Sequence, residues 1–163
     1  MSESTKSSTI RPRSIFNSHC DFAIISSQYN LDLTQALVDA AFQEIEALEH
    51  GAKISLVWAP GTFEIPVLAK FLASCANHDA IIAIGVILEG ETSHAKLIAH
   101  SVTHALQNVA VETGVPVIDG IVAGSDYDVV RARCLETEKN RGIEAARAAI
   151  SVARTIRELR KTI

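Results

Sequence analysis

The chain has 163 residues, of which 48% are hydrophobic and 21% charged, and its formal net charge at pH 7 is -4. This length fits one domain with a sizeable hydrophobic core, and the apolar content excludes disorder over the whole chain. The acidic balance offers no broad basic face to a polyphosphate backbone, so nucleic acid is not expected as a partner.

The cysteines and the N-terminal segment indicate where the folded domain lies. Cys20, Cys75 and Cys134 are far apart and form no C-x-x-C pair, which argues against a disulfide framework and a zinc site and favours free thiols in the cytoplasm. Residues 1–18 are rich in Ser and Thr and lack the apolar stretch of a signal peptide. We interpret 1–18 as a flexible N-terminal arm, or a strap on a neighbouring subunit, and 19–163 as the folded domain. No apolar run approaches membrane-spanning length.

The first half of the chain alternates short apolar runs with helical periodicity. The predicted elements are a strand over 22–25, a helix from Leu33 that ends at Gly51, a strand over 54–58 and a short helix over 65–74. Pro66 is compatible with that helix because it lies in the first turn.

The second half begins with the most apolar run of the chain, 80–88, which predicts a central strand covered on both faces. The next predicted elements are a helix from 89–93 to about Glu112, a strand over 115–118, and helices over 127–135 and 143–160. Pro116 indicates an edge position or a strand start. Strands that alternate with helices predict an α/β fold: a three-layer, doubly wound, flavodoxin-like domain with a four-stranded parallel sheet.

Ligands of open parallel sheets bind beyond the carboxyl ends of the strands, which directs attention to the loops that follow each strand. After the first strand, Tyr29 could stack on a planar heterocycle beside the polar Asn30, or pack as a surface tyrosine on its own helix. After the second strand, Glu64 could accept hydrogen bonds from a polyhydroxyl or ureide ligand, or act only as a dipole partner of the following helix.

The loop over 89–94 carries the strongest chemical signal. Gly90 permits close backbone approach, Thr92 or Ser93 can cap the helix, and the free N–H groups of a helix N-terminus can hold an anion. His94 lies in the first helical turn, where an imidazole suits proton transfer near neutral pH. A structural histidine is the alternative.

Other polar residues give weaker signals. His100 and His104 stand at i, i+4 on one predicted helix but lack a third ligand at a suitable spacing, so no metal site is expected. Arg133 and Arg141 could bind phosphate in a bidentate manner, or lie on a solvated helix face.

Four segments resemble the lumazine synthase family. Residues Ala59-Pro60-Gly61-Thr62-Phe63-Glu64-Ile65-Pro66 are similar to its V-P-G-A-F-E-I-P motif, and Gly85-Val86-Ile87-Leu88-Glu89-Gly90-Glu91-Thr92-Ser93-His94 resembles G-x-V-I-R-G-E-T-x-H. Residues 113–117 and 140–146 are similar to its T-G-x-P-V and N-K-G-x-E-A-A segments. The motifs follow the family order from about Phe22 to Ile150.

The resemblance implies a transferase of riboflavin biosynthesis that condenses 5-amino-6-(D-ribitylamino)uracil with 3,4-dihydroxy-2-butanone 4-phosphate. The product is 6,7-dimethyl-8-ribityllumazine, and phosphate and water are released. It further implies no metal and no organic cofactor. His94 is the implied proton donor and acceptor. The implied substrate-binding residues are Tyr29, Asn30, Thr62, Phe63, Glu64, Val86, Ile87, Leu88, Glu91, Thr92, Asp119, Arg133 and Arg141.

The resemblance also implies assembly, and it has departures. The family forms homopentamers, which stack as decamers or close into icosahedral sixty-subunit shells, with active sites shared between neighbouring subunits. Glu89 and Arg141 replace an arginine and a lysine of the motifs, Asp119 stands where the family places a phenylalanine against the pyrimidine, and Thr137 where a lysine is frequent. These changes motivate an alternative function: a catalytically weakened subunit that serves assembly of a cage.

Overall fold

The computed structural model describes residues 19–163 apart from 76, 91 and 92, so the interpretation of 1–18 lies outside the described residues. Its four parallel strands are in the order β2-β1-β3-β4. The strands are β1 (Asp21–Ser27), β2 (Lys53–Ala59), β3 (Ala80–Leu88) and β4 (Val117–Gly124). The helices are α1 (Leu31–Leu48), α2 (Ile65–Cys75), α3 (His94–Thr113), α4 (Tyr127–Leu135) and α5 (Arg141–Thr162), with 3-10 turns at Thr62–Glu64 and Thr137–Lys139.

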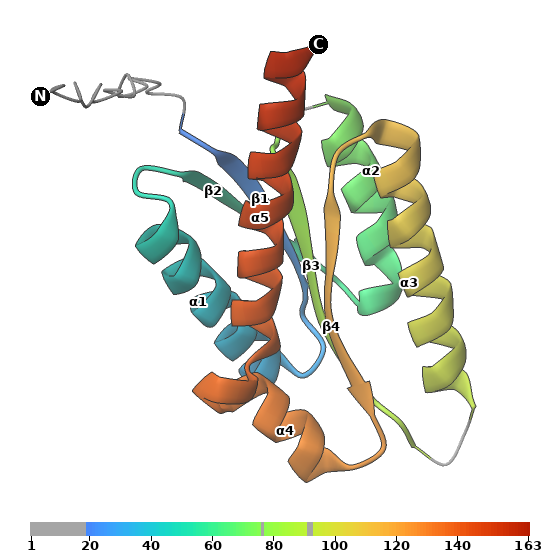
Figure 1. The fold of residues 1–163 in the computed structure, drawn as a ribbon. Helices are drawn as coiled ribbons and strands as arrows, with labels where there is room; N and C mark the ends of the chain where they lie inside the picture. The colour runs from blue at the N-terminus through green and yellow to red at the C-terminus, as the bar shows by residue number, and fades with distance from the viewer. Residues whose placement is uncertain (1–18, 76, 91–92) are drawn as a thin grey trace, which may run out of the picture.

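The sheet is the middle of three layers, which confirms the predicted α/β, flavodoxin-like class (Figure 1). Helices α1, α4 and α5 cover one face, and α2 and α3 cover the other. The buried strand β1 divides its side chains between two cores because successive residues point to opposite faces. Phe22 and Ile24 belong to the core under α1, α4 and α5, whereas Ala23 and Ile25 belong to the core under α2 and α3. No helix among the described residues is long and apolar enough to span a membrane.

The structure confirms the bounds of β3 and α4 and extends several other predicted elements. Strand β1 continues through Ser26 and Ser27, which are buried and paired in register with Trp58 and Ala59. Helix α1 ends at Leu48, so Gly51 lies in the following turn, where its φ of 80° favours glycine. Strand β4 is longer than its apolar run predicts and lies at an edge of the sheet, as Pro116 indicated.

The carboxyl ends of the strands are level in pairs, β1 with β2 at Ser27 and Ala59, and β3 with β4 at Leu88 and Gly124. The Gln28 amide donates to the Ala59 carbonyl and the Glu89 amide donates to the Gly124 carbonyl, each at 2.9 Å, so these hydrogen bonds continue two ladders just past the strand ends. The loops after all four strands therefore emerge along one edge, which is where ligands of such sheets bind.

Helix α5 packs closely against α1 because Gly142 has no side chain. A Cβ at Gly142 would lie 2.2 Å from the Leu37 carbonyl oxygen. Gly142→Ala should therefore lower the free energy of unfolding by about 2 kcal/mol or more, since backbone must shift to admit the methyl group. Urea unfolding followed by circular dichroism measures this. Ser151→Ala, an exposed site on the same helix, is the control and should be neutral or slightly stabilising; an equal effect of both changes would contradict the packing.

Candidate active site

One cavity of about 640 Å³ at the carboxyl edge gathers most of the predicted site residues. We call it the aromatic cavity. It lies where the start of α1, the turn after β2, the end of β3 and the first turns of α3 meet. Its lining residues are Tyr29, Asn30, Gly61, Thr62, Phe63, Glu64, Val86, Ile87, Leu88, His94, Ala95 and Ile98. The sequence did not single out Gly61, Ala95 and Ile98.

Two aromatic rings border this cavity with most of their surface free. Tyr29 is 73% exposed and Phe63 is 59% exposed. Rings of this size normally bury much of their area, and a planar ligand between or against them would recover that burial. Their exposure next to a cavity favours stacking over the alternative of a tyrosine packed on its own helix.

Asn30 connects two of the elements that line the aromatic cavity. Its backbone is in the left-handed region with φ 53°, and its carbonyl accepts hydrogen bonds from the amides of Leu33 and Thr34 at the start of α1. Its side-chain amide donates to the Val86 carbonyl at 2.9 Å. The side chain therefore joins the start of α1 to the end of β3, and the Val86 carbonyl is already engaged by it.

The turn after β2 packs closely against β3, and its Glu64 carboxylate has no partner among the described residues. A Cβ at Gly85 would lie 2.7 Å from the Thr62 hydroxyl oxygen, so only glycine admits the buried Thr62 side chain there. The exposed Glu64 carboxylate makes no hydrogen bond or ion pair with any residue that the structure describes. It is available to accept hydrogen bonds from a ligand.

His94 is the first residue of α3, and its exposed ring lines the aromatic cavity. Within the described part of the chain the imidazole has no hydrogen-bond partner. Of the two predicted caps, Thr92 or Ser93, Ser93 occupies the N-cap position without a side-chain cap bond and so does not cap the helix. The other predicted residues of this loop, Glu91 and Thr92, lie outside the described residues. The Glu89 carboxylate lies 3.7 Å from the Lys96 ammonium, which offsets the charge of Glu89.

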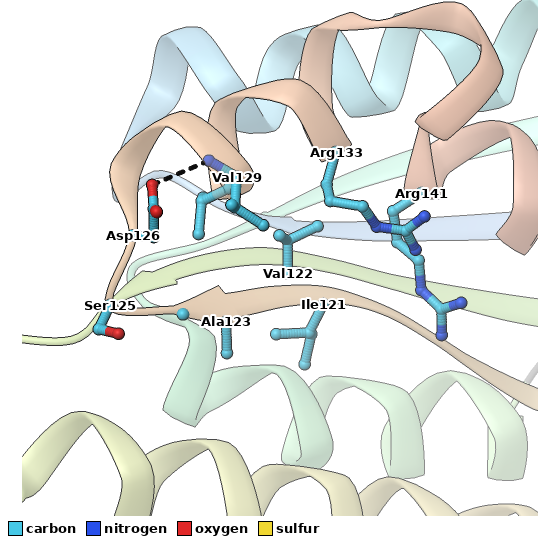
Figure 2. Close-up of a pocket in the computed structure, with 10 residues that line it drawn as sticks. Ile121, Val122, Ala123, Ser125, Asp126, Val129, Arg133 and Arg141 are labelled. Carbon is cyan, nitrogen blue, oxygen red and sulfur yellow. Dashed lines mark hydrogen bonds between the residues drawn. The ribbon is translucent and has the colours of Figure 1, made fainter.

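A second cavity of about 520 Å³ lies between the end of β4, the first turns of α4 and the start of α5. We call it the arginine cavity, because Arg133 and Arg141 both line it (Figure 2). Asp126 also lines it, but its carboxylate caps α4 by accepting from the amides of Asp128 and Val129. The free amides at the start of α4 are therefore largely satisfied by the chain itself.

The two arginines are held by a carboxylate that the sequence analysis missed. Glu144 accepts hydrogen bonds from Arg133 at 2.9 and 2.7 Å and from Arg141 at 3.1 Å. Hydrogen bonding to Arg133, assisted by Arg141, lowers the pKa of Glu144 to about 2, and the same contact raises the pKa of Arg133. The Arg141–Glu144 pair has helical i, i+3 spacing, which the sequence could have revealed; Arg133 comes from another helix.

Asp119 stands where the family resemblance implies a phenylalanine, and its oxygens accept hydrogen bonds within the chain. One carboxylate oxygen accepts from the Ile121 amide at 2.9 Å, and the other accepts from the Thr103 hydroxyl at 3.2 Å. Its carbonyl accepts from Arg141 at 2.6 Å. Asp119 does not line either of the two cavities as the described residues form them, and its acceptors are used within the chain.

The remaining thiols and histidines point to no further site. His100 and His104 are exposed on α3, and no group of three potential metal ligands occurs among the described residues. Cys20 and Cys134 are buried and Cys75 is exposed. Burial raises the pKa of the Cys134 thiol to about 11, so it stays protonated and unreactive at neutral pH.

Comparisons with known proteins agree on one family. A family model described as 6,7-dimethyl-8-ribityllumazine synthase matches residues 19–157. A 6,7-dimethyl-8-ribityllumazine synthase of Coxiella burnetii is 35% identical over 141 residues, which cover 86% of this chain and 93% of the relative. Relatives of the same name from Corynebacterium urealyticum and Thermococcus onnurineus are 37% and 36% identical; each match covers 84% of this chain, and 84% and 89% of the respective relatives.

Two substitutions separate the contributions of Asn30 to stability that come from its left-handed backbone and from its side-chain hydrogen bond. Asn30→Gly loses the hydrogen bond to the Val86 carbonyl but tolerates a positive φ, whereas Asn30→Ala loses the bond and strains the backbone. Asn30→Ala should therefore be less stable than Asn30→Gly by about 1 kcal/mol. Thermal unfolding of both variants measures the difference. Equal melting temperatures would show that the left-handed conformation at Asn30 carries no cost.

Proposed function

This chain belongs to the 6,7-dimethyl-8-ribityllumazine synthase family, and from that premise we propose how its two cavities divide the substrates. The chain is an enzyme with lumazine synthase activity, a transferase of riboflavin biosynthesis. In our assignment the aromatic cavity binds 5-amino-6-(D-ribitylamino)uracil. Arg133 and Arg141 in the arginine cavity bind the phosphate of 3,4-dihydroxy-2-butanone 4-phosphate.

The observation that carries the pyrimidine assignment is the convergence of rings, a free carboxylate and strand-end backbone on one cavity. Tyr29 and Phe63 offer faces for the heterocycle. The Glu64 carboxylate can accept hydrogen bonds from ring N–H or ribityl hydroxyl groups, because no described residue donates a hydrogen bond to it. Thr62, Ile87 and Leu88 complete the wall. A ligand that satisfies all of these contacts is flat, apolar on its faces and rich in polar edge groups.

His94 is assigned the proton transfers. Closing the second ring forms carbon–nitrogen bonds and releases water and phosphate, so protons must leave the attacking amine and reach the departing oxygens. An imidazole can do both near neutral pH when it lies within reach of the reacting atoms. The position of His94 at the cavity wall supports this role. The rest of the rate enhancement comes from holding two substrates together, which converts an encounter into a unimolecular step.

The division of charge between the cavities supports a site shared by two protomers. Among the described lining residues, the aromatic cavity has no Lys or Arg and the arginine cavity has no aromatic ring. The two described linings share no residue, so we assign each active site to the aromatic cavity of one protomer and the arginine cavity of the next. Exposed apolar side chains on α2 and α3, among them Val67, Phe71 and Leu97, suit burial between copies in a pentamer or its multiples.

One observation favours the alternative of a weakened, cage-forming subunit. The Asp119 side chain bonds within its own chain, so it supplies no ring wall to a neighbouring site. A steady-state assay with both substrates, paired with light scattering, decides between the two. Normal lumazine formation by the assembled protein supports full activity, whereas assembly with trace turnover supports the alternative.

The roles of His94 and Tyr29 predict different kinetic changes. His94→Ala should lower kcat about 100-fold with little change in either KM, because the imidazole acts in the chemical steps. Tyr29→Ala should raise the KM for the pyrimidine about tenfold through loss of stacking and ring burial, and change the KM for the butanone phosphate less than about twofold. Steady-state kinetics measure both. Unchanged turnover would remove the assignment of His94, and equal effects on the two KM values would argue against stacking.

The shared site can be tested by mixing inactive chains. His94→Ala damages the aromatic cavity and Arg133→Ala damages the arginine cavity. If each site combines cavities from two protomers, co-refolding equal amounts should restore about a quarter of wild-type activity, since half of each kind of cavity is intact and the halves combine at random. His94→Ala mixed with Tyr29→Ala, both in the aromatic cavity, is the control and should show no activity above the mean of the two variants measured separately. No recovery in the first mixture would indicate that each active site uses the two cavities of a single chain.

A further inference from the structure

Glu144 contacts both arginines of the arginine cavity but does not line the cavity itself. It lies in the first turn of α5, and both of its carboxylate oxygens are used by guanidinium groups. Arg133 arrives from α4 and makes a two-point contact, while Arg141 arrives from the start of α5. A carboxylate that accepts from two arginines fixes the direction in which each of them points.

Arg141 is fixed a second time. Besides its bond to Glu144, its other terminal nitrogen donates to the Asp119 carbonyl on β4 at 2.6 Å. A planar guanidinium can reach both acceptors at once, whereas the lysine of the family motif would offer only a point charge on a flexible stem. The departure at Arg141 therefore ties β4 and α5 together beside the cavity.

Both arginines keep unused donors. Each uses two N–H groups in the described contacts, and a guanidinium has more than two. Arg133 and Arg141 are 33% and 34% exposed, so their remaining N–H groups are accessible. The three side chains carry one net positive charge together, because a single carboxylate offsets two cations.

We propose that Glu144 is the positioning residue of the phosphate site: it holds Arg133 and Arg141 side by side so that their free N–H groups form one preorganised clamp for a phosphate monoester. The proposal rests on the assignment of the arginine cavity to the butanone phosphate. Without Glu144 the two cations repel each other and each side chain regains rotamers, so phosphate must then order them.

A neutral substitution separates positioning from simple neutralisation. If Glu144 only offset the arginine charges, Glu144→Gln would leave two unopposed cations and phosphate would bind more tightly. If Glu144 positions them, Glu144→Gln weakens phosphate binding, and Glu144→Ala weakens it further because no acceptor is left. The side chain is 43% exposed, so both variants should fold. The low pKa of Glu144, about 2, means that the wild-type carboxylate stays charged throughout the assay range.

The test uses the full chain, with inorganic phosphate as the probe in isothermal titration calorimetry and with both substrates in steady-state assays. Glu144→Gln should raise the dissociation constant of phosphate and the KM for the butanone phosphate about tenfold, the scale of a lost charge-assisted hydrogen bond. The KM for the pyrimidine should change less than about twofold. Glu158→Gln is the matched control, since Glu158 is also on α5 and also paired with a cation, Lys161, and it should leave all three constants unchanged.

The outcomes are distinct from those that test the function. Tighter or unchanged phosphate binding in Glu144→Gln overturns the proposal, and so does an equal rise of both KM values, which would indicate a general structural defect. Failure of the wild-type chain to bind phosphate also overturns it. Failure of the wild-type chain to form lumazine while it binds phosphate would count against the proposed function alone, because calorimetry tests the clamp without turnover.

Discussion

The parallel register of β1 and β3 is the constraint on which the whole site depends. These two strands are buried almost along their length and pair directly, Phe22 with Ala80 through Ser26 with Ile84. A shift of β1 by one residue would reverse its faces and move Ile24 from one core to the other. Because every buried side chain opposes such a shift, the strand ends keep their relative positions, and Tyr29, Thr62 and His94 start from fixed positions at one edge.

Local sequence predicted the bounds of the continuously apolar β3 and of α4, and gave bounds that are too short for the strands that polar residues interrupt. Strand β3 and helix α4 have the predicted bounds, whereas β1 and β4 run further than their apolar patterns. Ser26 and Ser27 continue β1 because the ladder to β2 supplies their backbone hydrogen bonds. Asp119 and Gly120 interrupt the apolar pattern of β4, yet their pairing with β3 keeps the strand extended. Tertiary pairing outweighed local preference in both strands.

The two cavities also differ in how far the sequence predicted their contacts. Most of the aromatic cavity was predictable because most of its residues lie at strand ends or in the loops that follow them, whose position the fold class determines. The contacts of the two arginines could not be predicted, because they join different elements. Arg133 on α4 contacts Glu144 on α5, and Arg141 on α5 contacts the Asp119 carbonyl on β4. A sequence of charges does not reveal which pairs meet, and each arginine taken singly was as consistent with a solvated helix face. The structure shows in addition that both arginines contact one carboxylate.

The proposed roles account for the contrast between two restrained arginines and an unrestrained imidazole. Binding a phosphate gains most when its donors are already oriented, because reorganising two cations would consume binding free energy; Arg133 and Arg141 are oriented by three bonds to Glu144. A proton carrier must instead contact different atoms at successive steps, and a strong partner would hold it in one tautomer. His94 has no such partner among the described residues. With the roles proposed above, fixed arginines and a free histidine would orient one substrate before protons move on the other.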